Sequence, residues 1–332
     1  MKRLLPFLLA PVLAVAAHEA PAVFNMNIER LAPEFDALVA PDANVEKVAE
    51  GFHWSEGPVW KDGALYFSDV PENKLYKWSP GDAAAKVFLQ PSGGMESTPD
   101  FKEPGSNGLT VDARGRMVLC QQGMRRVARL EADGKQVPMV SAFEGKHFNS
   151  PNDVVFARSG DFYFTDPPYG LKGLNDSPLK ELKFNGVYRV KPSGETTLLV
   201  NDLTFPNGLA FSPDEKTFYV TVSDPEVAKI YAFEVNADGT LAHRRVLFDA
   251  TSLVSPDRKG LPDGMKVDAH GNLWATGPGG VFVISPSGKH LGTIATNQPT
   301  GNCAWGDDGS TLYITANMFI ARVKTKTKGA GW

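Results

Sequence analysis

The sequence predicts an all-β protein, a six-bladed β-propeller with four-stranded blades. Segments with helical periodicity are nearly absent, and one short phrase occurs six times. Each phrase has a polar residue, usually followed by Gly, then a short apolar run, a turn and a second apolar run. Successive polar residues are 51, 45, 55, 56 and 39 residues apart, a spacing typical of one four-stranded blade. The six polar residues are Glu56, Asn107, Asn152, Asn207, Asp263 and Asn302.

Strands are expected where β-branched and aromatic residues cluster between turns. The clearest second strands of blades contain 65–67, 162–164, 218–220 and 312–314, and third strands follow at 74–78, 126–130, 186–190, 229–233 and 280–284. After Asn302, Met318–Val323 is already a third strand, and too little chain remains for a fourth. We therefore expect Asn44–Ala49 to supply the missing strand, so that the N- and C-terminal segments pair and close the ring.

The N-terminus has the pattern of a secretory signal peptide, assigned to residues 1–17. Lys2 and Arg3 precede an apolar run that is too short to span a bilayer, and we expect cleavage after Ala16 or Ala17. Residues 18–43 are expected to form an extension with a short helix from Ile28 to Val39, interrupted by Pro33. Residues 44–325 form the propeller and 326–332 a C-terminal tail. Export, most simply to the periplasm, is the expected location.

Composition excludes several classes of partner. A net charge of −4 gives no basic surface for nucleic acid, and no polybasic patch or second apolar stretch indicates a membrane after signal cleavage. Cys120 and Cys303 fall in blades two and six, so two buried free thiols are expected rather than a disulfide. A small-molecule ligand and a monomer or small homo-oligomer fit this composition.

The six polar residues are predicted to meet at the propeller axis, because the first strand of every blade lines the central channel. Six buried polar groups without partners would cost several kcal/mol, on the order of 2–7 kcal/mol each. A hard cation satisfies such oxygens, and two carboxylates, Glu56 and Asp263, neutralise one divalent ion. Amide oxygens of Asn152 and Asn207 complete the set, and the absence of His and Cys favours calcium over zinc or copper, with magnesium, manganese and zinc as alternatives. Each Asn-Gly or Asp-Gly pair taken alone also fits a plain turn.

These phrases resemble the senescence-marker-protein/gluconolactonase (regucalcin-like) family of six-bladed propellers, in its bacterial gluconolactonase branch. The likeness runs from about Asn44 to Lys324 and is carried by EGPVW, GSNGLTVD, SPND, TDPPYGL, FPNGLAFSPD and LPDGMKVDAHGNLW. It implies a divalent metal on Glu56, Asn152, Asn207 and Asp263, and hydrolysis of sugar lactones such as gluconolactone. Ser150 stands where some relatives have an arginine that contacts substrate, which leaves the particular substrate open.

A mechanism follows from such a site. The metal polarises the lactone carbonyl, and a nearby carboxylate takes a proton from the attacking water. Asp263 is the expected base, with Asp153 as the alternative. Asn107, Asn302 and Tyr169 are expected to contact substrate; Tyr169 belongs to one of two long loops, 91–105 and 167–185, predicted to cover the channel mouth.

Two other functions fit the same pattern. The metal could polarise other esters, including phosphotriesters, or it could stabilise a propeller that only binds a partner, because propellers host many functions.

Overall fold

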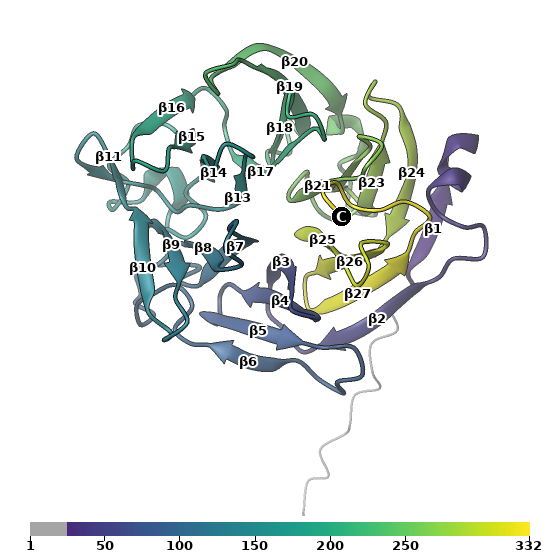
Figure 1. The fold of residues 1–332 in the computed structure, drawn as a ribbon, viewed down its shortest axis with the longest axis horizontal. Helices are drawn as coiled ribbons and strands as arrows, with labels where there is room; N and C mark the ends of the chain where they lie inside the picture. Colours follow the sequence, from purple (N-terminus) through teal and green to yellow (C-terminus); the bar gives the residue numbers. More distant parts are fainter. Residues whose placement is uncertain (1–24) are drawn as a thin grey trace, which may run out of the picture.

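Six antiparallel sheets surround one axis in the computed structural model, which describes residues 25–332 (Figure 1). The six-bladed β-propeller predicted from the repeats is therefore confirmed. The predicted signal peptide, residues 1–17, lies outside the described residues. Within residues 25–332, no helix has the length and apolar character needed to cross a bilayer.

The inner two strands of each blade come from the repeated phrases. The innermost strands are β3 (Ser55–Lys61), β7 (Ser106–Val111), β13 (Val154–Phe156), β17 (Pro206–Phe211), β21 (Met265–Val267) and β25 (Asn302–Gly306). The second strands are β4 (Ala64–Asp69), β8 (Met117–Gln121), β14 (Phe162–Asp166), β18 (Thr217–Val222), β22 (Leu273–Gly277) and β26 (Thr311–Ala316).

The outer strands follow in chain order except at the point where the ring closes. The third strands are β5 (Lys74–Trp78), β9 (Arg126–Leu130), β15 (Gly186–Val190), β19 (Lys229–Val235), β23 (Gly280–Ile284) and β27 (Phe319–Lys324). The fourth strands are β6 (Lys86–Leu89), β10 (Gln136–Val140), β16 (Thr196–Val200), β20 (Leu241–Asp249), β24 (His290–Ala295) and β2 (Val45–Glu50). Strands β11 (Ala142–Phe143) and β12 (Lys146–His147) form a separate small hairpin.

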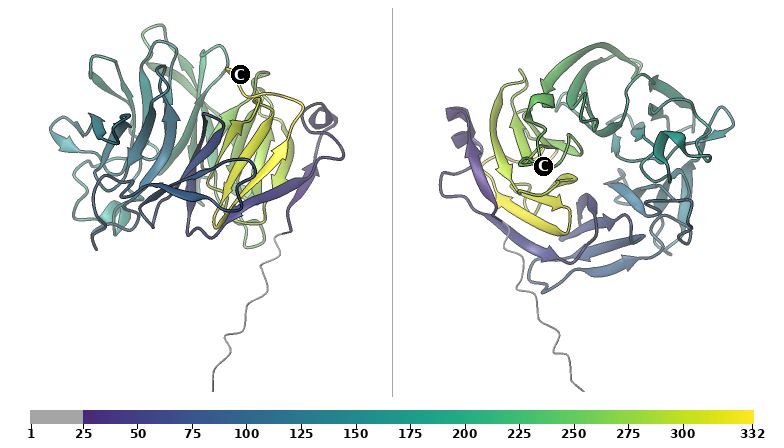
Figure 2. Two further views of the ribbon diagram at one scale, coloured as in Figure 1. Left: turned by 60° about the horizontal axis from the view of Figure 1, so that its bottom comes forward. Right: turned by 180° about the vertical axis from the view of Figure 1, so that it is seen from behind.

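The two ends of the chain close the ring in the predicted way. Strand β2 pairs antiparallel with β27, with Val45 opposite Val323, so an N-terminal strand completes the last blade. Figure 2 shows these N- and C-terminal segments side by side in both views. The closure covers the edge of β27 that would otherwise be open.

The helix predicted from Ile28 to Val39 is wrong. Residues Asn27–Arg30 instead form strand β1, a fifth strand on β24, and only Pro33–Ala37 form a 3₁₀ helix. Proline lacks a backbone N–H and has a fixed φ, so Pro33 begins the helical turn rather than lying inside a longer helix. The extended residues before it satisfy their backbone groups on the free edge of β24. Two further 3₁₀ turns lie at Leu174–Asp176 and Thr251–Leu253.

The start of the inner strand is irregular in three blades. The pairing of β3 with β4 shifts between Glu56 and Val59, and the same kind of bulge follows Ser106 in β7 and Pro206 in β17. A bulge re-aims the side chain it carries. In blades three and five, Asn152 and Asp263 precede the strand. In blade six, Asn302 pairs regularly with Thr315.

Glycines after the polar residues allow neighbouring inner strands to touch. A Cβ on Gly57 would lie 2.0 Å from the carbonyl oxygen of Asn107, and one on Gly208 would lie 2.2 Å from that of Asp263. The same carbonyls accept hydrogen bonds from the second strand of the preceding blade, as from Thr221 Oγ1 to Asp263 O at 2.6 Å. We call these contacts the axial belt. It fixes the height and orientation of each polar residue along the axis.

Packing between blades anchors the N-terminal extension as well. Phe35 is fully buried in the cluster of blades five and six, with Trp274 and Leu291, and its ring lies directly against Gly292. Both cysteines are buried and free, as expected. The C-terminal tail packs at the end of the channel away from the inner-strand starts, where Ala330 N donates to Val267 O at 2.9 Å.

Phe35→Ala tests whether the extension belongs to the folded core. Truncating a fully buried Phe removes its burial energy and leaves a cavity, so the free energy of unfolding should fall by about 3–5 kcal/mol. Leu31→Ala is the matched control, because Leu31 is 58 % exposed and should change stability by less than about 0.5 kcal/mol. Chemical denaturation measures both values, and equal stabilities for the two variants would contradict the assignment.

Candidate active site

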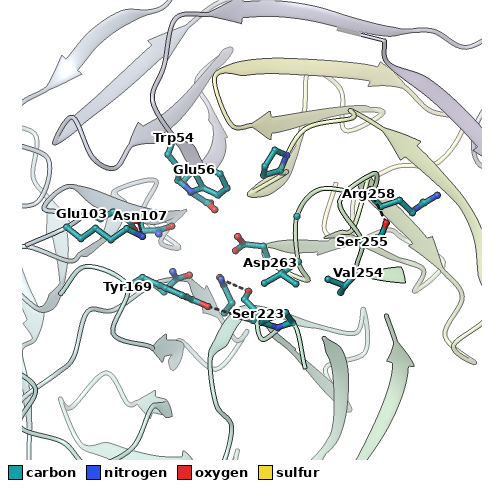
Figure 3. Close-up of a pocket in the computed structure, with 17 residues that line it drawn as sticks. Trp54, Glu56, Glu103, Asn107, Tyr169, Ser223, Val254, Ser255, Arg258 and Asp263 are labelled. Carbon is teal, nitrogen blue, oxygen red and sulfur yellow. Dashed lines mark hydrogen bonds and ion pairs between the residues drawn. The ribbon is translucent and has the colours of Figure 1, made fainter. Parts of the chain in front are cut away.

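A cavity of about 580 Å³ opens at the end of the channel where the inner strands begin. Its wall contains all four predicted metal ligands, which come from blades one, three, four and five, and it also contains Asn107 and Tyr169. Figure 3 shows the carboxylates of Glu56 and Asp263 directed toward one another across its centre. Asp153 and Asn302 do not line the cavity. The predicted ligands are Glu56, Asn152, Asn207 and Asp263.

Glu56 is held by the bulge at the start of β3. Its Oε2 accepts a hydrogen bond from the backbone N–H of Gly57 at 2.8 Å, and its Oε1 lies against Gly301 of blade six, where a Cβ would be 2.4 Å away. The side chain is almost fully buried. A carboxylate is thus fixed at the inner end of the cavity with little freedom to move.

Asn207 presents an amide oxygen with no protein partner. Its Nδ2 donates to Ser223 Oγ at 2.9 Å, while Oδ1 is buried and accepts no hydrogen bond from any described residue. Buried acceptors are nearly always satisfied, so an orphan of this kind indicates that something else occupies the position. A cation beside Oδ1 would satisfy it.

Burial of several carboxylates at one place shifts their titration strongly. Burial raises the pKa of Glu56 to about 8, and repulsion from Asp153 contributes to this rise. The pKa of Asp263 also lies well above its usual value, first because of burial and then because of Glu56, Asp153 and Glu103. Both groups are therefore unfavourable as anions unless a positive charge compensates them.

Lys266 supplies one such charge beneath the cavity. Its Nζ donates to Asn302 Oδ1 at 3.3 Å, and Asn302 Nδ2 donates to Asp153 Oδ2 at 3.3 Å. Burial raises the pKa of Asp153, and the nearby Lys266 opposes that rise. Because an ammonium group only donates, Lys266 determines which end of the Asn302 amide faces Asp153. Asn302 therefore links a lysine to a carboxylate, although it was predicted to contact substrate.

The two long loops lie at the cavity, where they were expected. They are joined by a bridge between Phe101 and Leu171 and by a hydrogen bond from Lys102 N to Gly170 O at 2.9 Å. Tyr169 OH donates to Ser223 O at 3.3 Å, so its ring forms part of the wall. Ser150 is buried and binds the second loop, with its Oγ donating to Pro167 O at 2.7 Å. It does not reach the cavity.

The donor set fits a hard cation. Among residues 25–332, no group of three or more His, Cys, Asp and Glu side chains is arranged to hold a metal ion. A metal at the axis would therefore use two carboxylates together with amide oxygens, including the orphan Oδ1 of Asn207. Oxygen ligands of this kind suit calcium, magnesium or manganese better than zinc.

Sequence reasoning missed part of the wall. Glu103 and Lys102 lie within the predicted loop 91–105 but were not predicted to be site residues, and in the segment 254–261 only Leu261 belongs to a motif that the sequence analysis identified. Arg258 from that segment pairs with Glu29 of β1 at 3.0 Å. None of these residues belongs to the repeat, so the repeat spacing could not predict that they line the cavity. Lys266 could have been noticed as a charged residue on an inner strand.

Fold and cavity together define a class: a six-bladed propeller with an axial site of buried carboxylate and amide oxygens. Residues 54–318 match the model of the SMP-30/gluconolactonase/LRE-like region, and this chain belongs to that family. The resemblance inferred from the motifs is thus confirmed.

Individual relatives agree with this assignment. A gluconolactonase of Zymomonas mobilis is 42 % identical over 92 % of this chain and 89 % of its own length. The solved structure of a gluconolactonase from Xanthomonas campestris is 32 % identical, with a TM-score of 0.78 over 93 % of this chain and 99 % of that one. A pentonolactonase of Haloferax volcanii is 26 % identical over 78 % of this chain and 80 % of its own length.

The raised pKa of Glu56 predicts how stability depends on pH when divalent ions are chelated. The folded form binds a proton that the unfolded chain releases near pH 4.5, so thermal stability in excess chelator should fall as the pH rises from 4.5 to about 8. Glu56→Gln carries no titrating group there and should flatten the fall. Melting temperatures across this range measure the effect.

Glu96→Gln is the control, since Glu96 is an exposed carboxylate that does not line the cavity. It should retain the wild-type slope. A Glu56→Gln slope equal to that of the wild type would show that this carboxylate does not carry the buried charge.

Proposed function

We propose that this protein is a divalent-metal-dependent lactonase that opens sugar lactones by hydrolysis. One observation carries the proposal: Glu56, Asn152, Asn207 and Asp263 converge on a single cavity and leave a buried acceptor, Asn207 Oδ1, without a partner. Family membership and the gluconolactonase and pentonolactonase names of relatives support lactones as the substrate class. The cavity has room for a small sugar lactone.

Calcium is the ion that we favour. Four oxygen ligands from rigid inner strands leave further positions for water and substrate, which suits a cation that accepts six to eight oxygens. When bound, the ion would polarise the lactone carbonyl and stabilise the negative charge that forms on its oxygen during attack.

Asp263 is the base in this proposal. It lines the cavity, where its carboxylate is directed toward that of Glu56 (Figure 3). It takes a proton from the water whose oxygen attacks the carbonyl carbon. The bond from that carbon to the ring oxygen then breaks, and the proton passes to the ring oxygen, which becomes a hydroxyl group of the hydroxy acid product.

Asp153 suits this role less well. Its carboxylate does not line the cavity, and it is already bound by the Val154 N–H at 2.9 Å and by Asn302 at 3.3 Å. Its negative charge adds to those of Glu56 and Asp263 at the axis, and we assign it to strengthening the attraction of the site for a cation. Asn107 and Tyr169 are proposed to contact substrate from the wall. Export to the periplasm, as a monomer or small homo-oligomer, completes the proposal.

Asp263→Asn should lower kcat on a sugar lactone by about 10²–10⁴-fold, the usual contribution of a positioned general base. Asn keeps the size of the side chain, so thermal unfolding should show a folded protein. Asp308→Asn, an exposed aspartate remote from the cavity, is the control and should retain full activity. Near-wild-type turnover in Asp263→Asn with a strong loss in Asp153→Asn would move the base to Asp153.

Metal dependence is tested by acid release in weak buffer with a pH indicator. Purified protein should open glucono-1,5-lactone faster than the uncatalysed background, lose this activity in excess chelator and regain it when calcium is added. A panel of sugar lactones, simple esters and phosphotriesters then defines the substrate class. Absence of metal-dependent acid release across the panel would favour a propeller that binds a partner without catalysis.

A further inference from the structure

Glu103 is a carboxylate in the cavity wall that the proposed reaction does not use. It belongs to the loop 91–105, apart from the axial ligands, and Figure 3 shows it on the same side as Asn107, with the segment 254–261 opposite. It is close enough to Asp263 and Tyr169 to raise the pKa of both groups. Because it belongs to the wall and not to the axial set, it suits contact with a part of the substrate other than the carbonyl.

The backbone around Glu103 is firmly held. Its own N–H donates to Gly170 O at 3.4 Å, Pro104 O accepts from Gly123 N at 3.1 Å, and Gly105 N donates to Val70 O at 3.0 Å. Three separate segments therefore hold the backbone that carries the side chain. A binding group on such a support needs little ordering when a ligand arrives.

The carboxylate has unused hydrogen-bonding capacity. Its side chain is only 15 % exposed, and among the described residues the one cation that pairs with it is Lys102, whose Nζ is 3.0 Å from Oε1. Lys102 itself is 60 % exposed. An ionised carboxylate offers about four acceptor positions, and among the described residues only Lys102 pairs with the carboxylate of Glu103.

A ligand that satisfies this carboxylate must bring donors without negative charge, because Glu56 and Asp263 face the same space. Neighbouring hydroxyl groups on a lactone ring meet both requirements. We infer that Glu103 is a specificity-determining residue that accepts hydrogen bonds from the ring hydroxyls of the sugar lactone. This inference rests on the proposed lactonase activity and assigns the residue that recognises those hydroxyls.

The preference arises from the free-energy cost of a buried hydrogen-bond acceptor that is left without a donor. A site built to bind a substrate hydroxyl rejects the analogue that lacks it, because the buried polar group of the site is then left unpaired. Glucono-1,5-lactone supplies the hydroxyl donors. δ-Valerolactone has the same six-membered ring and none of these hydroxyls, so the pair isolates this interaction.

The test compares Glu103→Gln and Glu103→Leu with the wild type on both lactones, with metal supplied. On glucono-1,5-lactone, KM should rise about 10- to 100-fold with little change in kcat, as expected for loss of hydrogen bonds to a charged group. On δ-valerolactone, Glu103→Gln should change kcat/KM less than about threefold, and Glu103→Leu should raise it, since the unpaired carboxylate is gone. Glu96→Gln, an exposed carboxylate of the same loop, is the control and should match the wild type.

Each other outcome overturns the inference. Equal losses on both lactones would show a general role in catalysis or folding, and unchanged KM values on both would show no contact with hydroxyls. A wild type that opens neither lactone above background would overturn the proposed function itself, and the inference with it.

Discussion

The structure depends on the axial belt, the ring of backbone contacts where the six inner strands begin. At Gly57, Gly108 and Gly208 the contact needs a residue without a side chain, because the carbonyl of the next blade occupies the space of a Cβ. Hydroxyl groups such as Thr221 Oγ1 then bind the same carbonyls. The polar residue beside each glycine is thereby set at one height, which is how segments more than two hundred residues apart supply one site.

Bringing these oxygens together buries several negative charges close to one another, and the rest of the site must compensate for their repulsion. Glu56, Asp153 and Asp263 are all buried within mutual reach, and each has a raised pKa. Lys266 offsets one charge through Asn302. A divalent ion would offset the other two, and in the proposed function that ion is also the source of catalytic power. The same ion would then both neutralise the buried carboxylates and take part in catalysis.

The repeat made the fold predictable because each polar residue occurs at the same point of a strand pattern. It predicted the ring, the closing strand at 44–49 and the meeting of Glu56, Asn107, Asn152, Asn207 and Asp263, which form the cavity wall. Asn302 occupies the same sequence position, yet it does not line the cavity and instead bonds Lys266 and Asp153. Blade six pairs regularly at Asn302, whereas a bulge re-aims the residue in blades one, two and four. The pairing register depends on both strands of a pair, so one repeated sequence phrase does not predict it.

The loops were less predictable for a related reason. Glu103 and the segment 254–261 reach the cavity through contacts with distant chain segments, such as Gly170 and Glu29, and no local pattern marks those contacts. The Ile28–Val39 helix failed in the same way, because the free edge of β24 offered Asn27–Arg30 a partner that propensity does not consider. The local sequence pattern predicted the repeated strands of the blades. Contacts between distant segments determined where the loops and the N-terminal extension lie.

The most direct test of this account is the anomalous scattering of crystals grown with Mn²⁺ in place of calcium. The account predicts one strong anomalous peak per chain on the propeller axis, within bonding distance of oxygens from Glu56, Asn152, Asn207 and Asp263. A well-ordered crystal with no peak there, or with its only peak held by other residues, would contradict it.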